Sequence, residues 1–267
     1  MLALLNIYYA QFKISFATQL QYRAELLIWL IGFILEPTVY LVVWTAVSNA
    51  NGGSIDGFAP RDFAAYFIVT MMVNFMTFDW HMWEMEFRIR EGQFSPLLLR
   101  PVHPIHADLA ANITYKILTL GIMLPVAVVL CFVFDAPIHP DAATVGLFLA
   151  ALLLAFMMRS LVEWTLALAA FWTTRTLAIN RIYFSLNLFL SGRMAPIALL
   201  PAPMQLAATY LPFRWAVSFP AQVLLGRVNA SQALHGLLIQ CGWIFASFVL
   251  LNIVWRVGVR RYAGVGA

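Results

Sequence analysis

Charged side chains are scarce in this chain of 267 residues. Asp, Glu, Lys and Arg make up 10% of it, whereas hydrophobic residues make up 63%. A soluble domain usually carries about a quarter charged residues and somewhat under half apolar ones. A soluble fold of this length would lack the polar surface that keeps it dispersed. The proportions therefore exclude soluble and disordered classes and indicate a membrane protein.

Cysteine is almost absent as well. Cys131 and Cys241 both lie in apolar runs, and no cluster of cysteine and histidine accompanies them. The sequence therefore predicts neither a disulfide framework nor a zinc site. The first residues lack both a basic start and a small-residue cleavage site, so we expect no signal peptide.

Motifs for catalysis and nucleotide binding are missing too. The chain has no G-x-x-x-x-G-K-[ST], no H-E-x-x-H and no G-x-S-x-G, so we expect no ATP-binding site and no enzyme here. His103 and His106 lie close to Asp108 and leave a membrane-embedded acyltransferase as an alternative. Pro101 and Pro104 interrupt the helix that such a site would use, which favours a structural or interfacial role for these histidines.

Long apolar runs dominate the sequence instead. Because a helix needs about 20 apolar residues to cross a bilayer, we expect an all-α, polytopic membrane protein with six transmembrane helices, at residues 26–47, 63–83, 113–134, 142–172, 177–190 and 234–257. We treat residues 1–267 as a single transmembrane domain.

Three segments lie outside these spans. Residues 1–22 carry aromatic and apolar side chains at helical spacing, which predicts an interfacial helix. Residues 84–111 form a loop in which Glu84–Arg88 and Glu86–Arg90 are spaced to support a short helix. Residues 192–233 contain five prolines and are too apolar for a free loop, so we expect short re-entrant helices there.

The loops also predict the orientation. One set of span ends carries ten basic residues, namely Lys13, Arg23, Arg88, Arg90, Arg100, Arg175, Arg181, Arg256, Arg260 and Arg261. The opposite ends carry four, namely Arg61, Arg193, Arg214 and Arg227. By the positive-inside rule both termini are cytoplasmic. The net charge of +4 then reflects cytoplasmic loops, and we expect no nucleic-acid partner.

A few ionisable residues lie within the spans. Glu36 falls near the predicted bilayer midplane and precedes Pro37. An acid at that depth either serves function or bonds a neighbouring helix in its protonated form, and the sequence leaves both open. Arg159 and Glu163 are spaced to pair on one helix face. Because Arg159 and Asp79 lie nearer the cytoplasmic boundary, we expect them to snorkel towards it.

Two segments resemble the permeases of ABC-2-type exporters. The first, after the second span, reads R-x-G-x-x-x-x-L-L-x-R-P with Arg90, Gly92, Leu97, Leu98, Arg100 and Pro101. The second, between the fifth and sixth spans, has Ser191, Gly192, Pro196, Pro201, Leu211, Pro212, Phe213, Pro220 and Gly226. Together with the six-span layout, the resemblance covers essentially the whole chain and is closest to small stand-alone permeases of the viologen-exporter type.

The resemblance implies the partners of the chain. A second permease, identical or homologous, would complete the pathway. Two copies of a separate ABC ATPase would bind ATP and Mg, and this chain would bind no cofactor itself. The location would be the bacterial cytoplasmic membrane, in contact with membrane lipid.

The resemblance also implies site residues. A coupling helix at about residues 91–110 would contact the ATPase through Arg88, Arg90, Gly92, Leu97, Leu98, Arg100 and Pro101. Candidates for the substrate pathway are Glu36, Asn74, Asn180 and Asn187. The outer gate would contain Gly192, Pro196, Pro201, Pro212, Phe213 and Pro220.

The expected activity is ATP-driven export of an amphipathic, lipid-like or cationic organic substrate. A cationic compound would suit Glu36. An ion-coupled secondary transporter that uses Glu36 and the Arg159–Glu163 pair is the alternative from another class, although the sequence shows no inverted repeat.

Overall fold

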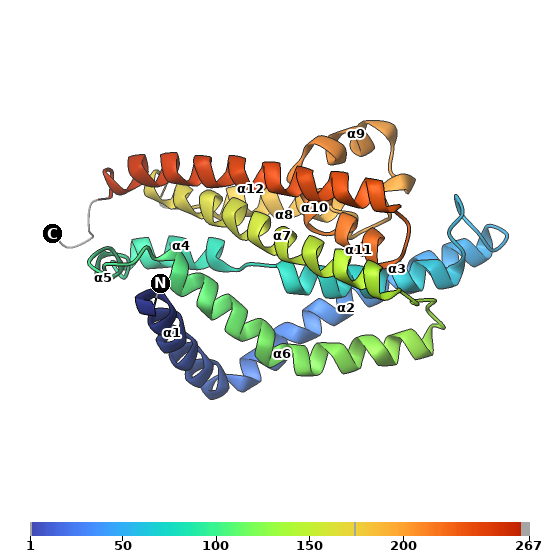
Figure 1. Ribbon diagram of the computed structural model, residues 1–267, viewed down its shortest axis with the longest axis horizontal. Helices are drawn as coiled ribbons and strands as arrows, with labels where there is room; N and C mark the ends of the chain where they lie inside the picture. The colour runs from blue at the N-terminus through green and yellow to red at the C-terminus, as the bar shows by residue number, and fades with distance from the viewer. Residues whose placement is uncertain (1, 174, 263–267) are drawn as a thin grey trace.

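The computed structural model describes residues 2–173 and 175–262, so residue 1 and residues 263–267 of the predicted domain lie outside the described residues. The described part is helical, with one isolated bridge between Ile55 and Phe58. An all-α polytopic architecture is therefore confirmed (Figure 1).

Five helical segments are long and apolar enough to cross a membrane. They are α2 (Arg23–Ala50), α3 (Pro60–Thr77) continued by α4 (His81–Arg90), α6 (Ile105–Val133), α7 (Ala142–Ala167) continued by η1 (Leu168–Phe171), and α12 (Ala230–Val259). The predicted fifth span is α8 (Leu177–Leu190), which at about 1.5 Å per residue is only about 21 Å long. A hydrocarbon core is about 30 Å thick, so α8 alone does not cross it.

The segment α3–α4 lies at the centre of the bundle. In its most apolar window 78% of the residues are buried, against 11–28% in the other four long segments. Figure 1 shows it between α6 on one side and the pair α7 and α12 on the other. Every other long helix can therefore face lipid on one side, whereas α3–α4 is surrounded by protein.

Two large apolar clusters hold the bundle around this central segment. Near the N-terminus of α3, Phe63 and Phe67 pack with residues of α2 and α6. Around α4, Met82 and Met85 pack with residues of α7, α8 and α12. The large aromatic rings and the flexible methionine side chains fill the space where these helices cross.

The N-terminal helix α1 (Leu2–Gln21) lies beside the beginning of α6 (Figure 1). The hydroxyl of Tyr8 lies 2.7 Å from Nδ1 of His106, and the side-chain amide of Gln19 donates to the carbonyl of Ala111 at 3.0 Å. Tyr9 and Phe16 stay exposed. These exposed side chains are available to a membrane surface, and the interfacial position of α1 stays a prediction.

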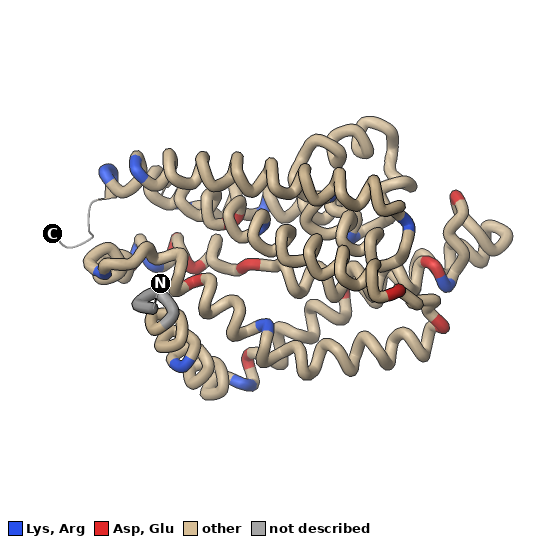
Figure 2. Tube along the Cα trace, in the orientation of Figure 1, with Lys and Arg blue, Asp and Glu red and all other residues tan. Residues whose placement is uncertain are grey.

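Several short helices complete the fold. Helix α5 (Ser95–Leu98) lies between α4 and α6 at the end of the bundle where α12 also ends (Figure 1). Near the opposite end, the chain forms η2 (Ile197–Leu199), α9 (Ala202–Tyr210), α10 (Pro212–Ala216) and α11 (Ser218–Leu224). Figure 2 shows basic residues at both ends, including the C-terminal end of α12.

Two span boundaries differ from the sequence prediction. The second span, predicted as continuous over 63–83, is interrupted after Thr77 and resumes at His81. The third span begins at Ile105 rather than at residue 113, so residues 105–111 of the predicted loop are helical. Polar side chains at Asp108 and Asn112 disguise this helix in the sequence, because they are buried and bonded rather than exposed.

Gly236 tests the packing of α12. A Cβ at this position would collide with the ring of Phe219 in α11, whereas a Cβ on Gly242 of the same helix meets nothing within 4 Å. Replacing an exposed helical glycine by alanine stabilises by about 0.5–1 kcal/mol. Overpacking costs about 1–3 kcal/mol. We therefore expect Gly236→Ala to lower the melting temperature in detergent and Gly242→Ala to raise it slightly. Equal effects of both substitutions would contradict this packing.

Candidate functional site

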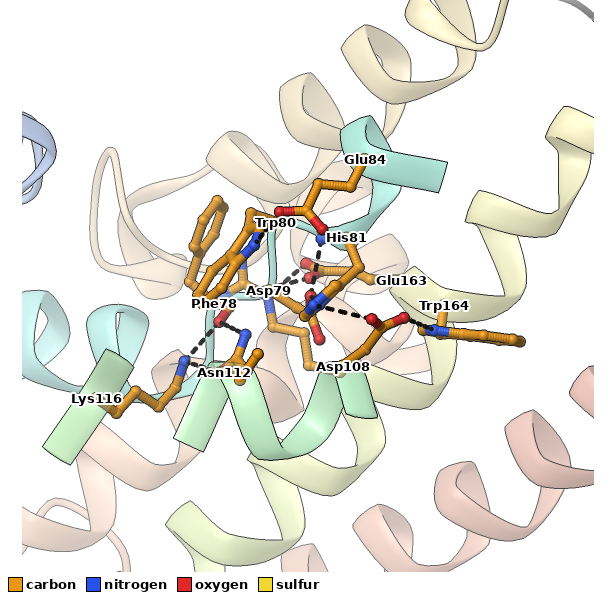
Figure 3. Close-up of polar contacts among 12 residues, drawn as sticks. Phe78, Asp79, Trp80, His81, Glu84, Asp108, Asn112, Lys116, Glu163 and Trp164 are labelled. Atoms are coloured by element: carbon orange, nitrogen blue, oxygen red, sulfur yellow. Dashed lines mark hydrogen bonds and ion pairs between the residues drawn. The ribbon is translucent and has the colours of Figure 1, made fainter. Parts of the chain in front are cut away.

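The interruption between α3 and α4 exposes backbone groups inside the bundle. Phe78 adopts an extended conformation, with φ −61° and ψ 140°. A helix end leaves carbonyl and N–H groups without helical partners, which is costly away from water. The carbonyl of Phe78 accepts from Nζ of Lys116 at 2.7 Å and from the amide of Asn112 at 3.3 Å. The N–H of Asp79 donates to Glu163 Oε2 at 3.0 Å. Side chains of α6 and α7 thus replace the missing helical bonds (Figure 3).

Asp79 organises the start of α4. Its carboxylate accepts from the backbone N–H of His81 at 2.9 Å and also bonds the Nδ1 atom of the same residue. A carboxylate at a helix N-terminus satisfies an unpaired N–H group and interacts favourably with the helix dipole. Both side chains are buried. The expectation that Asp79 snorkels to the membrane boundary is therefore wrong, because it caps a helix inside the protein.

Asp108 joins three helices. Its Oδ1 accepts from Arg88 of α4 at 2.7 Å, and its Oδ2 accepts from the indole N–H of Trp164 of α7 at 2.9 Å. His81 Nε2 lies 3.6 Å from the same carboxylate. Arg88 also donates to Glu84 at 2.5 Å, which confirms the predicted pairing on this helix. Figure 3 shows His81 and Glu84 of α4, Asp108 of α6 and Trp164 of α7 converging.

The Arg159–Glu163 pair lies deeper in the bundle. Arg159 Nε donates to Glu163 Oε1 at 2.7 Å, and its Nη1 donates to Asn74 at 2.9 Å and to Thr77 at 3.1 Å. The hydroxyl of Tyr183 in α8 donates to Glu163 at 3.0 Å. Both charged side chains are only 1% exposed. Snorkelling of Arg159 is therefore wrong: its pairing on one helix face places it in the core.

We call these residues the buried polar network: Asn74, Thr77, Asp79, His81, Glu84, Arg88, Asp108, Asn112, Lys116, Arg159, Glu163, Trp164 and Tyr183. Burying an unpaired charge costs several kcal/mol, and a close partner with further hydrogen bonds compensates much of that cost. The network therefore requires all its helices at once.

Glu36 and Arg193 form a second polar contact towards the other end. Arg193 Nη2 lies 2.7 and 2.8 Å from the two carboxylate oxygens of Glu36, and its Nη1 lies 3.5 Å from Oδ1 of Asn187. The Glu36 side chain is 41% exposed. The structure thus gives Glu36 a basic partner, Arg193, which neither of the alternatives drawn from the sequence had named.

The other pathway candidates are interior residues. Asn74, Asn180 and Asn187 are all buried. The amide of Asn180 donates to the carbonyl of Met82 at 3.4 Å and so joins α8 to α4. A cavity of about 10 Å³ separates Asn187 from Arg159. Polar groups thus extend from the buried network towards the Glu36–Arg193 pair.

Three of the predicted outer-gate residues are prolines at the beginnings of short helices. Pro196 precedes η2, Pro201 precedes α9, and Pro212 is the first residue of α10. The remaining three are Gly192, Phe213 and Pro220. Gly192 has φ +86°, and its carbonyl accepts from the hydroxyl of Tyr66 at 2.8 Å. A Cβ there would meet Tyr66 and Ser218, so this turn needs glycine. Phe213 and Pro220 are buried against the bundle.

The predicted coupling residues surround α5. The ring of Phe94, directly before α5, is fully buried against Phe171, Trp255 and Tyr262. Tyr262 also lies 2.8 Å from Ser95 Oγ. Of the predicted residues, Arg88, Gly92, Leu97 and Leu98 are partly buried, whereas Arg90, Arg100 and Pro101 are exposed. Leu99, which was not predicted, is exposed beside them. The loop therefore has an anchored base and an exposed tip.

The histidines near this loop do not form a joint site with Asp108. His106 bonds Tyr8 of α1, whereas the ring of His103 lies against that of Trp255 with centroids 4.2 Å apart. Among the described residues, no group of three His, Cys, Asp or Glu side chains could hold a metal ion. The arrangement gives no support to the acyltransferase alternative.

Sequence reasoning missed part of the network. Asp79, His81 and Lys116 were not linked, although a lysine within an apolar span was itself a signal of a buried partner. The pairing depends on the helix interruption at Phe78, which apolar composition does not reveal.

The Arg159–Glu163 pair gives a test of the network. Arg159→Met leaves a buried carboxylate unpaired, which costs about 3–5 kcal/mol. Glu163→Gln in the same chain removes that charge and keeps one acceptor oxygen for the N–H of Asp79, while its NH2 group can donate to the hydroxyl of Tyr183. We therefore expect the double variant to be more stable than Arg159→Met alone. Arg90→Met, at the exposed Arg90–Glu86 pair, is the control, with an effect below about 1 kcal/mol. The measurement is thermal unfolding in detergent, and an additive double variant would contradict the coupling.

His103 predicts a pH dependence. Burial, with a smaller contribution from the nearby His106, lowers the pKa of His103 to about 4. The unfolded chain has a histidine pKa of about 6.5, so it binds the proton more readily than the folded state. The neutral, partly buried His103 therefore makes its full contribution to the free energy of unfolding above about pH 6.5. This contribution is lost as the pH falls towards 4.

Melting temperatures measured at descending pH test this prediction. We expect the wild type to lose stability more steeply than His103→Phe, whereas His139→Gln, at an exposed histidine, should follow the wild type. Parallel curves for the wild type and His103→Phe would disprove the assignment to His103.

The comparisons with known proteins agree with this architecture. No match was found among curated proteins or among solved structures. A family model described as ABC-2 family transporter protein matches residues 33–266. The match covers α2 except for its first turns, and every helix that follows α2. The chain therefore belongs to the ABC-2 transporter family and is a membrane permease of an ABC transporter.

Proposed function

We propose that the chain is the permease subunit of an ATP-driven exporter in a bacterial cytoplasmic membrane. It pairs with a second permease, identical or homologous, and two copies of a separate ATPase hydrolyse ATP with Mg beneath them. The family supports the permease role. The absence of a P-loop in the sequence supports placing the hydrolysis on another chain.

The proposed orientation places the α5 end in the cytoplasm. This end carries Arg88, Arg90 and Arg100, together with Arg256, Arg260 and Arg261 at the end of α12 (Figure 2). Excess basic residues favour the cytoplasmic side. Both termini then lie on the cytoplasmic side, with α1 along that face of the membrane.

The ATPase is proposed to bind the tip of the α5 loop, and the exposure of Leu99 is the observation that carries this. Its side chain is 87% exposed, next to the exposed Arg100 and Pro101. Leu99 and Arg100 are exposed at the end of the bundle that this orientation places in the cytoplasm, and arginine is enriched at the centres of protein interfaces. The buried ring of Phe94 holds the base of the loop, so a force on the tip reaches the bundle.

The buried polar network offers a path for that force. Arg88 of α4 bonds Asp108 of α6, and Asp79 at the other end of α4 bonds Glu163 of α7. A displacement of the α5 loop therefore moves α4 against both neighbouring helices. Interfaces of this kind have discrete packings, which lets ATP binding switch access to the pathway.

The proposed substrate is amphipathic, lipid-like or a cationic organic compound. Glu36 carries a partly exposed carboxylate on α2, but Arg193 neutralises it. A cation would therefore have to share the carboxylate of Glu36 with Arg193 or displace Arg193 from it. The carboxylate is thus not an open cation site. Transport of a lipophilic cation by the reconstituted complex, with Glu36→Gln beside the wild type, would test this part.

The proposal predicts a stable complex that depends on the α5 tip. The tagged chain, purified in mild detergent from its host, should carry a P-loop ATPase identified by mass spectrometry. We expect Leu99→Asp to reduce the retained ATPase about tenfold, equivalent to about 1.4 kcal/mol, because it places a charge at an apolar contact.

Arg260→Ala is the matched control, because it alters an exposed basic residue at the same end of the bundle. It should retain the ATPase. A chain that purifies alone, while a known ABC complex survives the same procedure, would refute the proposed partnership. If Leu99→Asp retains as much ATPase as the wild type, the ATPase does not contact the tip of the α5 loop.

A further inference from the structure

A cavity opens at the end of the bundle opposite α5. Its volume is about 440 Å³, within the roughly 300–1,000 Å³ of small-molecule sites. Three helix ends form it: the last turns of α2, the start of α3 and the end of α6. The lining residues are Thr45, Ala59, Pro60, Arg61, Ala64, Phe134 and Asp135.

The cavity has apolar walls and one charge of each sign. Arg61 Nη1 lies 3.6 Å from Asp135 Oδ2, and both side chains are largely exposed, 65% and 87%. This separation exceeds a hydrogen bond, so the guanidinium and the carboxylate keep free hydrogen-bonding positions. An occupant thus meets a donor group from Arg61 and an acceptor from Asp135.

The depth of the cavity matches the boundary between hydrocarbon and headgroups. Thr45 lies five residues before the end of α2 at Ala50, which is about 8 Å at 1.5 Å per residue. Ala64 lies at a similar distance from the start of α3. Headgroups occupy several ångströms on each side of the hydrocarbon core. Beside the cavity, Phe132 and Val133 of α6 expose 83% and 68% of their surface, as side chains that face lipid do.

We propose that this cavity binds the headgroup of one zwitterionic phospholipid from the adjacent leaflet. The phosphate contacts Arg61, because guanidinium groups pair with phosphate through charge-assisted hydrogen bonds. The ammonium group contacts Asp135. The acyl chains lie along the exposed apolar surface of α6. An anionic lipid would satisfy Arg61 but place its negative charge against Asp135, so the site selects zwitterions.

This site is separate from the buried polar network and does not depend on the direction of transport. A bound lipid would connect the α2–α3 loop to the turn after α6. The only direct ion pair between those segments that lines the cavity is the Arg61–Asp135 contact, as far as the described residues show. The lipid would therefore act as a resident ligand that fixes the helix ends.

The test is native mass spectrometry of the full-length chain taken from membranes with equal amounts of phosphatidylethanolamine and phosphatidylglycerol. We expect one retained phosphatidylethanolamine per chain. Arg61→Gln should lower the lipid-bound fraction about tenfold, since a charged hydrogen bond is lost. Asp135→Asn should abolish the preference between the two lipids while binding persists.

Asp56→Asn is the matched control for Asp135→Asn. Both aspartates have positive φ, 45° and 48°, a conformation that asparagine tolerates. Asp56 lies in the α2–α3 loop but does not line the cavity, so its variant should keep the wild-type preference. Should Arg61→Gln fail to fold, Asp135→Asn still decides the question.

The proposal is overturned if the wild type retains both lipids equally, or if neither Arg61→Gln nor Asp135→Asn changes the lipid bound. It is likewise overturned if the retained molecule is not a phospholipid.

Discussion

The interruption of the second span is possible only because Lys116, Asn112 and Glu163 bond the backbone groups that it frees. At this buried position an unsatisfied carbonyl or N–H group would cost several kcal/mol. The three side chains come from α6 and α7. They arrange those helices around α3–α4, and the central position of this segment follows from them.

The same bonds limit what the interior can conduct. The polar groups that lead from Asp108 towards Glu36 include Arg159, Asn187 and Arg193. Arginine stays protonated in proteins, and the amide of asparagine does not titrate. Arg159, Asn187 and Arg193 therefore do not relay protons between the buried polar network and Glu36.

Much of the fold could be predicted from the sequence, because span length and apolar composition depend on each helix alone. The limits of α8 and the helical character of residues 192–226 followed in this way. Glu163 was correctly paired with Arg159, since four residues along a helix determine that contact. Its bond to Asp79 could not be predicted, because it depends on how two helices pack.

The candidate site was less accessible to sequence reasoning for the same reason. Arg159 and Asp79 have the depth of residues that snorkel, and only the surrounding helices show that they are enclosed. The sequence left open whether Glu36 serves function or bonds a neighbouring helix, and it gave no sign of Arg193, which the segment after Gly192 brings against Glu36. Polar residues in a membrane protein are interpreted correctly only with their partners, and here those partners lie far away in the sequence.

The central position of α3–α4 also affects how the chain is made. This segment is synthesised before α6 and α7, which supply Lys116, Arg159 and Glu163. Until those helices emerge, the carbonyl of Phe78 and the N–H of Asp79 lack the side chains that bond them in the folded chain. Polar groups in an isolated segment make its insertion unfavourable. The second span must therefore wait at the translocon or in a hydrated environment until the third and fourth spans arrive, and the bundle assembles as one cooperative unit rather than helix by helix.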